Sequence, residues 1–190
     1  MHKSIKASFV KQTNQSWCGL ACLSMICKYY GGDMPQTQLV KISGTSITGT
    51  TLLGLYQAAN IIGLKAEGLE GAIEELKQFS HPAILHCSTE TGLEHYVTCF
   101  GYENEHFIIG DPAKEILEMS VSELEKIWKS RKLLLIQKGD SFQSVNEAKE
   151  RKRMWIKSLL RPDMKVLLAI AGFGVFISAI GLSLAVFSQK

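Results

Sequence analysis

An uncharged apolar stretch near the C-terminus limits the folds open to this 190-residue chain. Residues 166–187 contain no Asp, Glu, Lys or Arg and are rich in Leu, Ile, Val, Ala, Phe and Gly. A helix of about 20 apolar residues matches the hydrocarbon thickness of a bilayer. The stretch therefore predicts a transmembrane helix over residues 166–187, and a globular fold has to be built from the residues before it.

Positive charge is concentrated just before this predicted span. Residues 149–165 contain seven Lys and Arg residues against Glu150 and Asp163. Basic residues beside a span tend to stay on the cytoplasmic side, and the N-terminus carries no apolar leader. We therefore expect a basic juxtamembrane linker helix over residues 140–165 and a cytosolic location for the residues before it. No basic patch with interleaved aromatic residues indicates a nucleic-acid partner.

The hydrophobic period changes along the residues before the linker. Apolar residues spaced three or four apart predict helices at residues 17–30, 35–42, 52–62 and 72–79. Short apolar runs then predict strands at residues 83–87, 95–100, 106–109, 116–119 and 133–136, with one more helix at residues 122–128. Helices followed by antiparallel strands are typical of an α+β fold.

Five cysteines raise the question of disulfides, metal binding or catalysis. They are Cys18, Cys22, Cys27, Cys87 and Cys99. Their number is odd and the expected compartment is reducing, so a disulfide framework is not expected. The chain has no CxxC pair, and we expect no metal site. Cys18 differs from the others because it begins a predicted helix, where free N–H groups and partial positive charge favour a thiolate.

On its own, Cys18 could equally well be a nucleophile or a buried core thiol. The residues that flank it favour the nucleophile. Gln12 lies upstream on a polar loop, and its carboxamide can join the backbone N–H of Cys18 in an oxyanion hole. Gln15 is a competing candidate for this role. Trp17 offers a bulky wall that favours substrates without a side chain at the reacting bond. Packing of Trp17 into the core is an equally good interpretation.

A base for this thiol is expected on the strands. The polar turn at residues 103–105 predicts a hairpin of the strands on either side. His95 and Asp111 then fall near the same end of that hairpin, where Asp111 can fix the tautomer of the imidazole. His86 is the rival base, but we expect no carboxylate within hairpin distance of it.

These residues belong to a longer pattern. Residues 11–23 read Lys-Gln-Thr-Asn-Gln-Ser-Trp-Cys-Gly-Leu-Ala-Cys-Leu, and Tyr-Tyr-Gly-Gly follows at residues 29–32. Over about residues 8–137 the chain resembles the peptidase domain of bacteriocin-exporting, peptidase-containing ABC transporters. Further matching pieces stand in the same order at residues 49–52, 82–86, 95–97 and 111–113. One departure is Lys-Glu-Ile at residues 114–116, where the family usually has a glycine-containing turn.

The resemblance implies a papain-like cysteine peptidase domain over residues 1–139. Cys18 would be its nucleophile, His95 the general base, Asp111 the orienting residue and Gln12 the oxyanion donor. The implied reaction is cleavage of a double-glycine-type leader from a bacteriocin-like or other small precursor peptide. This cysteine endopeptidase would act at the cytosolic face and be coupled to ABC-type export.

The resemblance also implies a larger protein than this chain. Family members have several spans and an ATPase domain, whereas here one span is predicted and no GxxxxGK[ST] phosphate loop is found. We therefore expect no cofactor in this segment, with ATP and Mg belonging to a missing nucleotide-binding domain. The intact protein would be a multi-pass homodimer in the cell inner membrane.

Two other functions stay open on the sequence. A non-catalytic substrate-docking domain of a peptide or protein exporter would need the same groove but no working triad. A membrane-anchored thiol redox sensor would need a resolving cysteine, for which Cys22 lies one helical turn from Cys18. The thiol of Cys18 is the feature that separates these functions from a peptidase.

Overall fold

The computed structural model describes residues 3–89, 92–144, 153–154, 170, 172–174, 176–178 and 180. The chain divides into two compact units, residues 1–145 and 146–190. Within the described residues, no helix is both long and apolar enough to cross a membrane. The linker predicted over residues 140–165 and the span predicted over residues 166–187 lie mostly outside the described residues. Both remain predictions.

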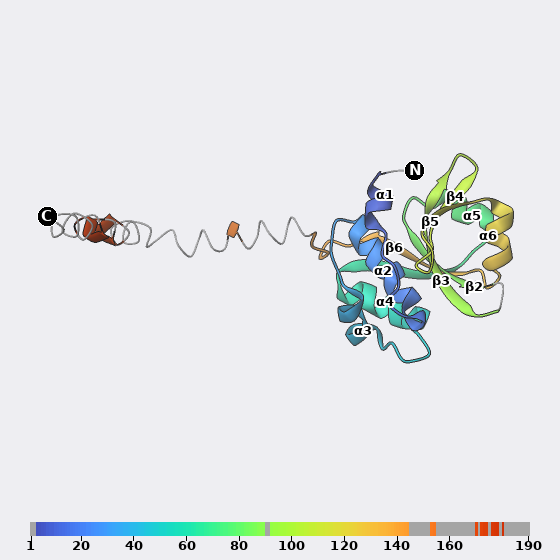
Figure 1. The fold of residues 1–190 in the computed structure, drawn as a ribbon. Helices are drawn as coiled ribbons and strands as arrows, with labels where there is room; N and C mark the ends of the chain where they lie inside the picture. Colours follow the sequence, from blue (N-terminus) through green and yellow to red (C-terminus); the bar gives the residue numbers. More distant parts are fainter. Residues whose placement is uncertain are drawn as a thin grey trace. The chain divides into compact units, whose positions relative to one another are not determined.

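The first unit is built on a six-stranded antiparallel sheet with the order β1-β6-β2-β3-β4-β5 (Figure 1). Its strands are β1 (Leu64–Glu70), β2 (Ala83–Ser88), β3 (Glu94–Glu103), β4 (His106–Gly110), β5 (Ile116–Met119) and β6 (Lys132–Lys138). Its helices are α1 (Lys3–Ser8), the 3₁₀ helix η1 (Gln15–Trp17), α2 (Cys18–Tyr29), α3 (Gln36–Ser43), α4 (Leu52–Ile61), α5 (Ile73–Gln78) and α6 (Val121–Ile127). The predicted α+β class with an antiparallel sheet is confirmed.

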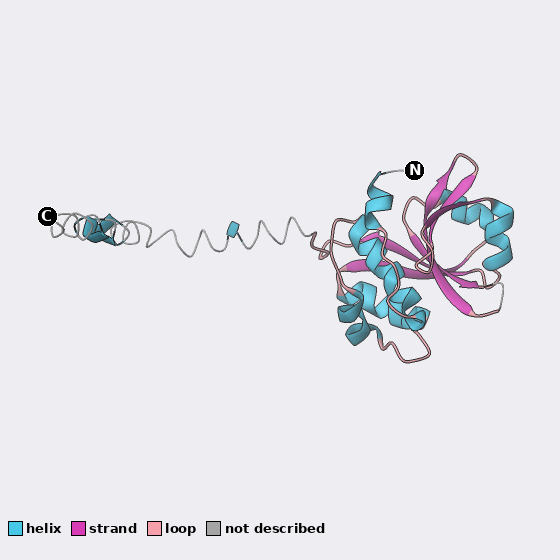
Figure 2. Ribbon diagram, viewed as in Figure 1, coloured by secondary structure: helices cyan, strands magenta, loops and turns pink. Residues whose placement is uncertain are grey.

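Each face of the sheet has its own hydrophobic core, because successive strand residues point to opposite faces. Ile84 and Leu134 pack with the helical group α1 to α4, whereas Leu85 and Leu133 pack with α5 and α6. Figure 2 shows helices on both sides of the sheet. The central strands β2 and β6 are therefore buried on both faces, which explains why they read as continuous apolar runs.

Two glycines end helix α2. The N–H of Gly31 donates to the carbonyl of Lys28 at 2.9 Å, and the N–H of Gly32 donates to the carbonyl of Cys27 at 2.8 Å. Gly31 has a φ of 82°, a conformation that glycine adopts without strain. The chain thus turns sharply away from the end of the central helix.

The start of α2 lies close to the sheet and to α4. A Cβ atom on Gly19 would lie 3.0 Å from the side chain of Leu55 on α4 and 3.2 Å from the ring of Tyr96 on β3. A side chain at this position would crowd both neighbours. Glycine at this position therefore lets the first turn of α2 approach the strand that carries His95.

Two elements, α1 and β1, were not expected from the sequence. Strand β1 lies at the edge of the sheet and includes Lys65, Glu67 and Glu70, whose charges hide the apolar alternation of a strand. Helix α1 is short and buries Ile5 against the helical side of the core. Strand β1 forms because it pairs with β6, and α1 forms because it buries one apolar residue. Neither cause can be read from the local sequence.

The core of the first unit includes a residue beyond position 139, where the predicted domain boundary falls, and that boundary stays a prediction. Phe142 is buried within the helical-side core, and its ring lies 6.4 Å from that of Tyr30. A Cβ atom on Gly32 would lie 2.5 Å from the Phe142 ring, so this glycine makes room for it. A chain ended at residue 139 would lose this core ring, and loss of a buried Phe side chain typically costs about 3–5 kcal/mol.

Candidate active site

Cys18 is the first residue of helix α2, where the sequence placed it. Asn14 caps the preceding η1 by accepting a hydrogen bond from the N–H of Ser16 at 2.9 Å. The chain then enters α2 through Trp17, and the side chain of Cys18 is only 7% exposed. The first N–H groups of a helix lack intrahelical partners and carry partial positive charge, which stabilises a thiolate at this position.

The hairpin of β3 and β4 brings His95 and Asp111 together. Thr98 pairs with Gly110 in this ladder, which confirms the predicted hairpin and its register near the site. Nε2 of His95 lies 2.8 Å from Oδ1 of Asp111, and the two side chains are 14% and 7% exposed. The carboxylate is thus placed to hold the imidazole in one orientation.

A tight turn after β4 fixes the carboxylate of Asp111. The N–H of Lys114 donates to the Asp111 carbonyl at 3.0 Å, and the N–H of Ala113 donates to Oδ1 of Asp111 at 3.0 Å. The turn closes without a glycine, so the unusual Lys-Glu-Ile sequence at residues 114–116 does not disturb the site. Nζ of Lys114 lies 3.9 Å from the other carboxylate oxygen, Oδ2.

The thiol of Cys18 contacts the imidazole of His95. Burial of the thiol would raise its pKa, but hydrogen bonds from His95 and from the backbones of Tyr96 and Gly19 outweigh burial. The pKa of Cys18 therefore lies below its usual value of 9.0. Because Nε2 of His95 faces Asp111, the remaining ring nitrogen, Nδ1, is the one that can serve the thiol.

The imidazole is held in its charged form. Burial alone would lower the pKa of His95, yet its hydrogen bonds with Asp111 and Cys18 raise it to about 9. Burial would raise the pKa of Asp111, but hydrogen bonds from His95 and Ala113 outweigh burial and lower it. At neutral pH the site therefore holds an imidazolium between a carboxylate and a thiol whose pKa is lowered, a coupled system in which the protons are shared.

The other four cysteines do not share this environment. All five thiols are unpaired and buried. Burial raises the pKa of Cys22 well above its usual value, raises that of Cys27 and Cys99 to about 12, and raises that of Cys87 further still. Cys22 thus lacks the thiolate that a resolving cysteine of a redox sensor needs.

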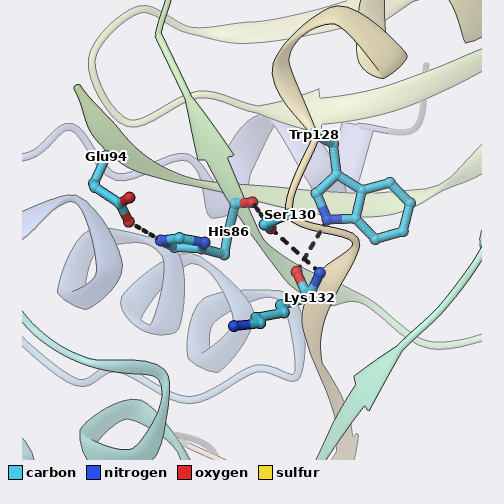
Figure 3. A network of polar contacts seen from close by, with 5 residues as sticks. All are labelled: His86, Glu94, Trp128, Ser130 and Lys132. Atoms are coloured by element: carbon cyan, nitrogen blue, oxygen red, sulfur yellow. Dashed lines mark hydrogen bonds and ion pairs between the residues drawn. The ribbon is translucent and has the colours of Figure 1, made fainter. Parts of the chain in front are cut away.

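His86 also pairs with a carboxylate, contrary to the sequence-based expectation. Strand β3 begins at Glu94, one residue earlier than predicted, and Glu94 lies diagonally across the β2–β3 ladder from His86. Nε2 of His86 contacts Oε2 of Glu94, while the hydroxyl of Ser130 donates to the His86 carbonyl at 2.5 Å (Figure 3). His95, not His86, is nevertheless the histidine that contacts the Cys18 thiol.

Gln12 lies beside the turn that holds Asp111. Its backbone N–H donates to the carbonyl of Pro112 at 3.0 Å. Its Oε1 atom is buried and finds no hydrogen-bond partner among the described residues. The rival Gln15 is exposed on η1, whereas Trp17 is half-buried and packs against the helical-side core. The roles assigned to Gln12 and Trp17 remain predictions.

Sequence reasoning missed Gln36, which secures the Gln12 loop from the other side. Gln36 is the first residue of α3 and is 8% exposed. Its carboxamide bonds to both Lys11 and Thr13, the two neighbours of Gln12. A glutamine at the start of a short helix usually faces solvent, so the sequence held no signal for this contact.

A thiol, an imidazole and a buried carboxylate in contact at the start of a helix form the constellation of a cysteine hydrolase. Residues 6–141 match the model of the Peptidase C39 family, and the chain belongs to this family.

Two curated relatives are transport and processing proteins. The chain is 35% identical over 124 residues to the Pediocin PA-1 transport/processing ATP-binding protein PedD of Pediococcus acidilactici. It is 31% identical over 121 residues to the Lactococcin-G-processing and transport ATP-binding protein LagD of Lactococcus lactis subsp. lactis. Each match covers 63% of this chain and 17% of the relative, so the chain spans less than a fifth of their length.

Solved structures share the fold. The peptidase domain of Streptococcus ComA, a bi-functional ABC transporter involved in a quorum sensing pathway, is similar with a TM-score of 0.62 and 28% identity. That match covers 68% of this chain and 96% of the domain. A double glycine motif protease from an AMS/PCAT transporter, solved in complex with the leader peptide, gives a TM-score of 0.61 and 28% identity. It is covered over 89% of its length, and this chain over 68%.

Proposed function

We propose that the first unit is a papain-like cysteine endopeptidase that removes a double-glycine-type leader from a small precursor peptide. The observation that carries this proposal is the contact of His95 with both Cys18 and Asp111, which lowers the pKa of the thiol and raises that of the imidazole. A domain that only docks its cargo would have no need of a thiolate–imidazolium pair. Membership of the Peptidase C39 family supports the same reaction class.

The reaction follows from the charges of the site. The thiolate of Cys18 attacks the carbonyl carbon of the second small residue, and a carbon–sulfur bond forms as the carbonyl oxygen becomes an oxyanion. Imidazolium His95 then gives its proton to the departing amine, the carbon–nitrogen bond breaks and a thioester remains. His95 next takes one proton from water as the water oxygen attacks the thioester. The carbon–sulfur bond breaks and restores the thiolate, and the leader leaves as a carboxylate whose proton passes to solvent.

Stabilisation of the oxyanion is assigned to the backbone N–H of Cys18 and to the carboxamide of Gln12. Donors that are in place before the reaction begins do not have to reorganise as charge develops. The loop that carries Gln12 is tied to Pro112 by a backbone hydrogen bond. The Oε1 atom of this carboxamide is buried without a hydrogen-bond partner among the described residues, and we assign its amide nitrogen to the oxyanion.

An apolar groove of about 450 Å³ supports recognition of the leader outside the cleaved bond. The groove runs between α4 and the strands β1 and β6, and Leu53 and Tyr56 on its rim are 64% and 41% exposed. Leu55 of α4 packs against Gly19, so the helix that borders the groove also packs against the helix that carries Cys18. We assign the apolar side chains of the leader to this groove, because two glycines by themselves supply little binding energy.

The location and assembly of the protein belong to this proposal as well. The relatives are transport and processing proteins, which supports a place for this unit at the cytosolic face of an ABC-type exporter in the cell membrane. In that assembly, two copies would act together, and ATP and Mg would bind a nucleotide-binding domain outside this chain. Trp17, the neighbour of Cys18, is assigned to a wall beside the two small residues at the cleaved bond.

A direct test uses a precursor whose leader ends in Gly-Gly and the full 190-residue chain. We expect one cut, after the second glycine, and strong slowing when either glycine is replaced by Leu. A short Gly-Gly peptide without a leader should be cut poorly, and Cys18→Ala should cut nothing. Mass spectrometry of the products reads the position of the cut. Hydrolysis of unrelated unfolded proteins at many sites would contradict the proposal.

The groove can be tested separately with two helix variants. Leu53→Glu places a charge in the groove, and we expect KM for the precursor to rise about tenfold with kcat unchanged, because the leader binds before the chemical step. Ile61→Glu is the matched control, since Ile61 is 65% exposed on the same helix and does not line the groove. An equal rise of KM in the two variants would show that the leader does not bind in this groove.

A further inference from the structure

Gln36 joins the two residues on either side of Gln12. Its Nε2 donates to the carbonyl of Lys11 at 2.7 Å. Its Oε1 accepts from the hydroxyl of Thr13 at 2.9 Å and from the backbone N–H of Thr13 at 3.3 Å. One buried carboxamide therefore fixes the backbone before and after the residue assigned to the oxyanion hole.

Both ends of this arrangement are attached to rigid parts of the fold. The hydroxyl of Ser24 on α2 donates to the carbonyl of Met34 at 2.7 Å, which ties the chain just before Gln36 to the helix that carries Cys18. On the opposite side, the N–H of Gln12 donates to the carbonyl of Pro112. The loop is thus held between the nucleophile helix and the turn that fixes Asp111.

We propose that Gln36 is a positioning residue for the oxyanion hole, acting through Gln12. This inference rests on the proposed function, since it takes Gln12 to be an oxyanion donor. A carboxamide is the side chain that can accept from Thr13 and donate to the carbonyl of Lys11 at once. An apolar side chain of similar size satisfies neither neighbour, and the loop loses the contacts that set the direction of Gln12.

The positioning role affects only one kind of reaction of the thiol. Acyl transfer passes through a tetrahedral oxyanion, so it depends on the aim of the donor groups. Alkylation of the same thiol by iodoacetamide forms no oxyanion and depends on the thiolate alone. A residue that acts through Gln12 should therefore change the first rate and leave the second unchanged.

The experiment compares Gln36→Met with Gln38→Met in the full chain. Gln38 is exposed on the same helix and serves as the matched control. We expect Gln36→Met to slow acylation of Cys18 by a Gly-Gly p-nitrophenyl ester about tenfold, less than the roughly 100-fold slowing from Gln12→Ala, which removes the donor itself. The iodoacetamide rate and KM for the ester should not change. Gln38→Met should alter neither rate.

Two further variants make the result decisive. In a Gln12→Ala background, Gln36→Met should cause no additional slowing, because the group it positions is gone. Gln36→Glu keeps the acceptor for Thr13 and loses the donor to Lys11, so an intermediate rate is expected even if Gln36→Met does not fold. Additive effects with Gln12→Ala, or an equal fall in the alkylation rate, would overturn the proposal.

Failure of the proposed function gives a different result. If the wild-type chain is acylated by the ester but leaves a Gly-Gly leader intact, the assigned substrate is wrong. The ester still measures the effect of Gln36 on the oxyanion in that case. An ester reaction that responds to neither Gln12→Ala nor Gln36→Met would contradict both oxyanion assignments while leaving the nucleophile in place.

Discussion

Two histidine–carboxylate pairs lie on neighbouring strands of the same sheet, and their surroundings differ. His95 and Asp111 are both nearly buried, whereas the Glu94 side chain that meets His86 is 74% exposed. A carboxylate in water interacts weakly with its partner, but a buried one that accepts further hydrogen bonds holds a fixed charge. The thiol of Cys18 meets only the buried pair. Burial and a third partner, rather than pairing itself, distinguish the His95 pair from the His86 pair.

Removal of the thiol should have the largest effect, because it leaves two histidine–carboxylate pairs and no nucleophile. We expect Cys18→Ala to lower kcat by at least about 10⁴-fold with the fold retained. Cys22→Ala, one helical turn away in the same core, should keep near-normal turnover per folded molecule. Cleavage assays with circular dichroism check both. A dead Cys22→Ala beside an active Cys18→Ala would reverse the assignment of the nucleophile.

Replacement of each histidine in turn by Ala compares the two pairs directly. His95→Ala should be about as damaging as Cys18→Ala, since members of a coupled triad lose most of the rate singly. His86→Ala should cost less than about tenfold, because its ring touches no reacting group. The measurement is kcat for a Gly-Gly precursor. An inactive His86→Ala with an active His95→Ala would show that the wrong pair had been chosen.

Replacement of the two carboxylates should lower kcat in the same order as replacement of their histidines, but by smaller factors. Asp111→Asn should be roughly 10- to 100-fold less damaging than His95→Ala, because Asp111 orients the ring and supports its charge without transferring the proton. Glu94→Gln should have little effect, since its side chain is mostly in water.

The pH profile of these variants tests the same contrast. The wild-type rate should fall as pH rises through about 9, where His95 loses the proton that it donates. Asp111→Asn removes a hydrogen bond and a charge that raise this pKa, while burial, which lowers it, remains. The alkaline limb should therefore move to lower pH in Asp111→Asn and stay in place in Glu94→Gln. Equal shifts would mean that the exposed carboxylate also controls His95.

Replacement of Lys114 should have the smallest effect on kcat. Its ammonium lies 3.9 Å from Asp111, but the side chain is 68% exposed, and exposed ion pairs contribute about 0–1 kcal/mol. Lys114→Ala should change kcat less than about threefold. A loss as large as that of Asp111→Asn would show that the carboxylate depends on a surface charge, and that burial is not what sets the two pairs apart.

The sequence allowed the site to be predicted where local signals were strong. A cysteine at a helix start and a polar hairpin turn at residues 103–105 led to Cys18, His95 and Asp111, and the resemblance to a known family named the same three residues. The polar edge strand β1, the Glu94 partner of His86 and the Gln36 contacts were missed. Each of these depends on pairing between residues distant in sequence, which no local period or turn residue reveals.

The most direct measurement is the site of covalent trapping. A leader peptide that ends in Gly-Gly chloromethyl ketone delivers an electrophile to the group that attacks the scissile carbonyl, and peptide mass spectrometry identifies the alkylated residue. We expect a single adduct on Cys18, formed much more slowly in His95→Ala and at a near-normal rate in His86→Ala. A cysteine peptidase built on Cys18, His95 and Asp111 would be contradicted by an adduct on Cys22 or on a residue outside the site. It would also be contradicted if the labelling of Cys18 did not depend on His95.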